Sequence, residues 1–124
     1  MTRNSYGIAL RSDASIWRFL EVARRGALLA GSPIHGERHW WETARVGTDL
    51  ARTEAGADPF AVVLFALIHD CRRMNEHHDH GHGVRGANVL RKIFANTVLP
   101  VSVELAITAS ELHDTAHVER SDAT

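Results

Sequence analysis

The chain has 124 residues, which is enough for one domain with a modest hydrophobic core. Its formal net charge of -1 at pH 7 gives no indication of nucleic-acid binding, and the longest apolar run, residues 60–68, is too short to span a membrane. The single cysteine excludes an internal disulfide, and the N-terminal residues lack the apolar segment of a signal peptide, so we expect a cytoplasmic protein.

The first expected helix follows an irregular segment of residues 1–12. Ser12 or Asp13 can serve as its N-cap, and the Gly-Ser-Pro sequence at 31–33 ends it near residue 30. The spacing of its apolar residues places one face toward a core, formed by Ile16, Leu20 and Ala23.

A second helix fits residues 36–55. His39, Val46 and Leu50 lie at positions i, i+7 and i+11, so they share one face of this helix. Two apolar side chains stand beside the histidine on that face, and we therefore expect the face to be buried.

The third expected helix has the clearest start. Asp58 is placed as its N-cap, and Pro59 occupies the first helical position. Residues 59–73 are apolar on most sides, which is typical of a central, buried helix. A polar, histidine-rich loop follows at residues 75–83.

Two further helices are expected after this loop. One spans about residues 83–96, with an inward face of Val84, Ala87, Leu90 and Phe94. The other starts at Pro100 and repeats every four residues through Val101, Leu105, Ala109 and His113, and we expect residues 115–124 to fray. Because the strict alternation of strands is absent, the sequence predicts one all-α domain of about five helices over residues 1–124.

His69 and Asp70 stand at the end of the apolar third helix. Burying a carboxylate without a partner is costly, and a divalent metal would satisfy both side chains, because imidazole offers a nitrogen lone pair and the carboxylate balances charge. A hydrogen-bonded pair at a helix end is the simpler interpretation of these two residues alone. Other expected helices also carry histidines on inner faces or at their starts, which favours a shared metal centre built from His39, His82 and His113 as well.

At this point the chain resembles a known family. The stretches that carry the resemblance are "HGERHWWETARVGTDLA" (35–51), "GADPFAVVLFALIHDCRR" (56–73) and "DHGHGVRGANVL" (79–90). They resemble the HD-domain superfamily of metal-dependent phosphohydrolases, and within it a group of uncharacterised bacterial proteins with "HG..HW", "LFAL.HD..R.NE" and "D..HG.R.A". The resemblance covers about residues 32–112 and implies an HD-type bundle of helices.

The resemblance also implies a set of metal ligands. Carried over residue by residue, the set is His39, His69, Asp70, His82 and His113. His35 lies one helical turn before His39 and is an alternative first ligand. We prefer His39, because the tryptophan after it and the expected apolar face of its helix fit the family pattern better.

The chain departs from the family pattern at the last ligand. The family closes its site with an aspartate from a later helix, whereas here Asp114 is the only aspartate near the fifth helix. Three alternatives follow: Asp114 replaces that ligand, Asp122 in the tail replaces it, or the ligand is missing from a truncated chain.

The resemblance implies hydrolysis by a metal-activated water, since a bound metal lowers the pKa of that water and draws charge from a phosphoryl oxygen. Asp70 would hold the metal and orient the water, with Arg73 and Glu76 as further catalytic residues. Arg72 and Arg85 would bind substrate phosphate. We expect one or two divalent ions, from Mn, Mg, Co, Zn, Ni or Fe, and a small phosphorylated substrate, with a nucleotide as the first choice.

Two other functions compete with this hypothesis. The same ligand types suit two irons, so an HD-type oxygenase is an alternative, and a degenerate or truncated module that binds a nucleotide or a protein partner is another. Neither nucleic acid nor a membrane is an expected partner. The oligomeric state is open, with a homodimer among the alternatives.

Overall fold

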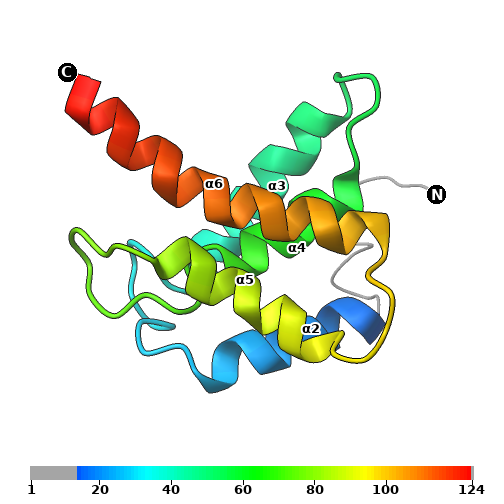
Figure 1. Ribbon diagram of the computed structural model, residues 1–124, viewed down its shortest axis with the longest axis horizontal. Helices are drawn as coiled ribbons and strands as arrows, with labels where there is room; N and C mark the ends of the chain where they lie inside the picture. The colour runs from blue at the N-terminus through cyan, green and yellow to red at the C-terminus, as the bar shows by residue number, and fades with distance from the viewer. Residues whose placement is uncertain (1–13, 124) are drawn as a thin grey trace.

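The computed structural model describes the main chain of residues 14–123 and the side chains of residues 16–113. The described residues form α-helices and no strand, which confirms the prediction of an all-α chain (Figure 1). The helices are α2 (Ala14–Arg25), α3 (Glu37–Ala51), α4 (Pro59–Ile68), α5 (His82–Ile93) and α6 (Val101–Ala123). The expectations for residues 1–12 lie outside the described residues, and for residues 115–124 only a helical main chain as far as Ala123 is described.

Helix α4 lies at the centre of the bundle and contacts each of the other four described helices. The Asp58 carboxylate accepts hydrogen bonds from the main-chain N–H groups of Phe60 and Ala61, which confirms the predicted N-cap, and Pro59 begins the helix. The other oxygen of Asp58 accepts from the Ser102 hydroxyl at 2.6 Å and so joins the start of α4 to the start of α6. Buried apolar residues on most sides of α4 make it the core of the domain: Ala61, Val63, Leu64, Ala66, Leu67 and Ile68.

Four helices end earlier than the sequence predicts, and two of them, α3 and α5, do so by a few residues, at Ala51 and Ile93. Helix α2 ends at Arg25, and Arg72 hydrogen-bonds to the carbonyl oxygens of Val22 and Ala23, near its end. Arg72 therefore caps this helix through a tertiary contact, at a point where Gly26 also follows the last helical residue. Helix α4 ends at Ile68, and a turn follows at residues 69–72.

The predicted inner faces of α3 and α6 are wrong, and that of α5 is right only in part, because Ala87 and Leu90 are buried whereas Val84 is 43% exposed. Val46 and Leu50 of α3 are 48% and 63% exposed, and α3 instead packs through the face of Trp40, Ala44, Thr48 and Ala51. This face is the buried one because a single large side chain, Trp40, beside small ones lets α3 approach α4 closely. Likewise, Leu105 of α6 is exposed, and the buried face of α6 is Val103, Ala106, Ile107 and Ser110.

Helix α5 meets the end of α4 at a glycine. A Cβ added to Gly86 would lie 2.2 Å from the carbonyl oxygen of Ile68 and 3.5 Å from the Ser110 hydroxyl oxygen. The contacting atom is main chain, so it can move only if a helix moves. Because Ile68 directly precedes His69, this close contact sets how near α5 comes to the turn after α4.

We therefore expect Gly86→Ala to lower the free energy of unfolding by about 1–3 kcal/mol, because the clash outweighs the gain in helix propensity. Gly31→Ala is the matched control, since a Cβ there has no atom within 4 Å. Urea denaturation of both variants measures the difference. Equal stability of the two variants would contradict the close contact.

Candidate metal centre

The His69–Asp70 pair lies at the point where α4 ends. His69 is the C-cap residue of α4, and Asp70 begins the following turn. Their side chains are almost fully buried, at 8% and 5% exposure. An Asp in that position needs partners for both of its oxygens, because desolvation of an unpaired carboxylate is costly.

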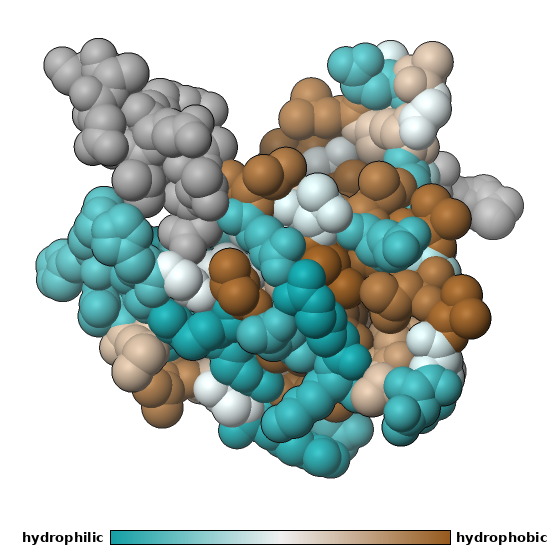
Figure 2. Space-filling view, in the orientation of Figure 1, coloured by the Kyte–Doolittle hydropathy of each residue, from teal (hydrophilic) through white to brown (hydrophobic). Residues whose placement is uncertain are grey.

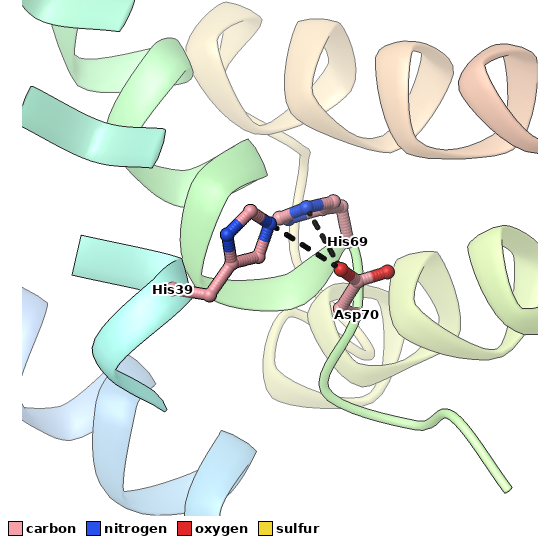
Figure 3. Close-up of side chains that lie close together, drawn as sticks. All are labelled: His39, His69 and Asp70. Carbon is pink, nitrogen blue, oxygen red and sulfur yellow. Dashed lines mark ion pairs between the residues drawn. The ribbon is translucent and has the colours of Figure 1, made fainter. Parts of the chain in front are cut away.

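Each oxygen of Asp70 faces a different group of side chains. Its Oδ2 lies 3.2 Å from His69 Nε2 and 3.8 Å from His39 Nε2, as Figure 3 shows. Its Oδ1 lies 3.5 Å from His82 Nε2 and 3.1 Å from Arg73 Nε. The carboxylate is thus shared between two sets of possible metal ligands.

Both sets are arranged to hold a metal ion. One is His39, His69 and Asp70, and the other is Asp70, His82 and His113; in each, one ligand atom per residue lies within 4.8 Å of the others. They come from α3, the end of α4, the start of α5 and the middle of α6. The structure therefore brings together five of the predicted metal ligands.

Three of these histidines are oriented in the same way. The Nδ1 atoms of His69, His82 and His113 lie 2.9, 2.6 and 2.6 Å from main-chain carbonyl oxygens three residues earlier. A carbonyl oxygen only accepts hydrogen bonds, so Nδ1 carries the proton and donates. In the neutral ring, Nε2 then has a lone pair, and this is the nitrogen that faces Asp70 or the neighbouring histidine.

This orientation makes lone pairs face one another. His82 Nε2 and His113 Nε2 are 3.1 Å apart, and His69 Nε2 faces the Asp70 carboxylate at 3.2 Å. Two acceptors at hydrogen-bond distance repel unless a proton or a metal ion lies between them. A metal ion bound at this centre would remove the repulsion in both places.

Burial keeps two of the imidazoles neutral. Burial lowers the pKa of His39 and of His113, and the neighbouring His69 lowers both further. Burial alone would raise the pKa of Asp70, but His69, when its Nε2 carries a proton in the metal-free protein, and Arg73 hold that pKa well below its usual range. Near pH 7 the site thus offers an ionised carboxylate at Asp70 and neutral imidazoles at His39 and His113, the forms that bind metal.

The structure separates the two candidates for the first ligand. His39 belongs to the set with His69 and Asp70, whereas His35 Nδ1 pairs with Glu76 Oε1 at 2.5 Å. The expected apolar face of α3 was the wrong reason for choosing His39. The side chain of His39 is instead 40% exposed and reaches Asp70 from the rim of the site.

Of the predicted catalytic residues, Arg73 and Glu76 lie in different places relative to Asp70. Arg73 lies in the site, where its guanidinium donates to Asp70 and to the loop carbonyls of Asn75 and His77. Glu76 meets His35 and none of the metal-ligand atoms. The structure therefore places Arg73 against Asp70, whereas Glu76 contacts His35, which is outside the two ligand sets.

The side chains of Arg72 and Arg85 bind other parts of the chain than the metal-ligand atoms. Arg72 donates to the end of α2. Arg85 donates to the carbonyl oxygens of Arg72 and His80 and to the Asp79 carboxylate. The side chains of Asp114 and Asp122 lie outside the described residues, so the predicted replacement ligands are not described.

Sequence reasoning missed one wall of the site. The Phe65 ring stacks on His69 with ring centroids 4.9 Å apart and meets His113 edge-on at 5.5 Å. Phe65 precedes His69 by four residues, so helical periodicity places both on one face of α4. That spacing was the signal available in the sequence.

Comparisons with protein-family models, with curated proteins and with solved structures found no match to this chain. Among the described residues, no helix is both long enough and apolar enough to cross a membrane.

The neutral histidines make the metal-free protein sensitive to acid. Because burial lowers the pKa of His39 and His113 below 6.5, the unfolded chain binds more protons than the folded chain as the pH falls through that value. We expect the free energy of unfolding to decrease between pH 7 and pH 5, by up to about 1.4 kcal/mol per pH unit for the proton taken up by the more buried His113, and by less for the partly exposed His39, whose charge water screens.

Urea denaturation in the presence of a chelator, repeated across this pH range, measures the effect. His113→Gln should flatten the profile, whereas His78→Gln, in the exposed loop, should leave it unchanged. A wild-type profile that is flat or rises toward pH 5 would contradict the neutral state of the buried rings.

Proposed function

We propose that this chain is a metal-dependent phosphohydrolase of the HD type, which acts on a phosphorylated small molecule, with a nucleotide as the first substrate to test. The observation that carries the proposal is the pair of ligand sets that share the carboxylate of Asp70. The resemblance of the "HG..HW", "HD" and "D..HG.R.A" stretches to HD-domain phosphohydrolases supports it.

The donor set suits particular metals. Imidazole nitrogens outnumber carboxylate oxygens in both sets, and such ligands suit Mn, Co, Zn, Ni or Fe better than Mg. When bound, a divalent ion supplies a water of lowered pKa and draws charge from a phosphoryl oxygen. Asp70 can take part in both sets, one oxygen toward each.

The surrounding residues hold these ligands in place. The carbonyl oxygens that accept from His69, His82 and His113 fix each ring and keep its Nε2 turned toward the centre. Arg73 hydrogen-bonds to Asp70 Oδ1 and ties the following loop to the turn, so it acts as a positioning residue. The partly exposed His39 marks the side from which a substrate can approach.

Elemental analysis of the untagged protein, paired with a phosphate-release screen over nucleotides with Mn²⁺, Co²⁺ and Mg²⁺, tests the proposal. We expect bound transition metal and phosphate release that Mn²⁺ or Co²⁺ supports. His69→Ala and Asp70→Asn should each lose metal and reduce the rate by about a hundredfold or more, because the ion supplies several kcal/mol of transition-state stabilisation.

The matched control is His78→Ala, in the exposed histidine-rich loop, which should keep both metal and rate. Circular dichroism of every variant separates loss of ligands from loss of fold. Two irons with a mixed-valence signal after aerobic purification would favour the oxygenase alternative. Protein without metal, and with a rate that His69→Ala leaves unchanged, would favour a non-catalytic module.

A further inference from the structure

A hollow borders the turn after α4 at the side chain of Arg72. It is a cleft of about 710 Å³ between the end of α2 and α5, two helices that contact each other. None of the residues that line it belongs to the two metal-ligand sets. Its size is in the range of small-molecule sites.

The cleft is lined by cations and by no acidic residue. The basic lining residues are Arg25, Arg72, Arg85, Arg91 and Lys92. Figure 2 shows strongly hydrophilic side chains gathered over α5 and toward α2 on the face turned to the viewer. Cations that line a hollow with low-dielectric walls raise the local potential and attract anions.

Two of these cations are already neutralised by neighbours. Arg85 pairs with Asp79 at 2.6 Å, and Arg91 pairs with Glu111 at 2.7 Å. These ion pairs fix the two guanidinium groups at the edge of the cleft. The uncompensated positive charge of the cleft therefore comes from Arg25, Arg72 and Lys92.

The remaining cations are not balanced in this way. The partly buried guanidinium of Arg72 donates to the carbonyl oxygens of Cys71, Val22 and Ala23, which orient it but carry no net charge. In the part of the chain that the structure describes, no carboxylate lies within ion-pair distance of Arg72 or Lys92. Arg25 has one loose, exposed contact with Glu21, at 3.6 Å. The cleft thus keeps a surplus of positive charge.

The walls between the cations are partly apolar. Val22, Val89 and Ala95 line the cleft, and Asn88 adds an amide. At Gly26, a Cβ would lie 2.9 Å from the central carbon of the Arg72 guanidinium, so the glycine leaves that group room beside α2. An anion with an attached ring or apolar part therefore matches both the charge and the walls.

We propose that this cleft binds a nucleoside polyphosphate, independently of the metal centre. Lys92, Arg25 and Arg72 would contact the phosphates, and the apolar wall would contact the base or sugar. Arg85 Nε donates to the Arg72 carbonyl at 3.1 Å, so the ligand would rest against the same turn that holds Asp70.

Fluorescence titration with trinitrophenyl-ATP in the presence of EDTA tests the proposal, because chelation removes binding that depends on metal. The folded full-length protein should bind the probe, and ATP and pyrophosphate should displace it, whereas adenosine should not. Arg25→Gln combined with Lys92→Gln should weaken binding about tenfold, since both are exposed phosphate contacts that no described carboxylate holds tightly.

Arg45→Gln combined with Arg52→Gln is the matched control, with the same change of charge on exposed positions of α3 and the residue after it. Its affinity should stay within about twofold of wild type. Equal weakening of both double variants, no binding in EDTA, or displacement by adenosine alone would overturn the proposal. So would a single-stranded oligonucleotide that binds much more tightly than ATP.

Discussion

The burial of the Asp70 carboxylate is the constraint on which the site depends. Its side chain is 5% exposed where α3, α4, α5 and α6 converge, and an ionised carboxylate there must be compensated on both oxygens. Arg73 compensates part of one oxygen. The imidazoles around it turn lone pairs toward the centre, because their Nδ1 protons are committed to main-chain carbonyls. A cation bound among these atoms would complete this set of groups.

The turn after α4 is short, and contacts on two sides hold it in place. On one side Asp70 faces the histidines, and on the other side Arg72 reaches the carbonyl oxygens at the end of α2. The contact between Gly86 and the Ile68 carbonyl sets the distance between this turn and α5. The packing of α5 against the end of α4 thereby sets the distance between His82 Nε2 and Asp70 Oδ1, which is 3.5 Å.

Much of the candidate site could be predicted from the sequence, although some of the reasons were wrong. His69, Asp70 and His82 stood out because polar ligands at the ends of apolar helices need partners, and the structure groups them. His39 also joins them, but not through the apolar face that was expected, since Val46 and Leu50 are exposed. A helix can carry two apolar stripes, and close packing against α4 selected the one with small residues. The predicted phosphate ligands, Arg72 and Arg85, lie away from the ligand atoms, because residues near one another in sequence leave a turn in different directions.

The sequence by itself determined the helical class, the capped start of α4 and the candidate metal-ligand residues, because helix periodicity, N-cap chemistry and the positions of histidines and Asp70 along the helices are properties of the sequence. Only the tertiary structure decided which face of α3 and α6 is buried, that Arg72 caps the end of α2, and that one carboxylate faces two sets of possible ligands. These features depend on contacts between residues far apart in the chain, such as Arg72 with Val22 and His82 with His113. Their energies arise only when the helices pack, so no local pattern records them.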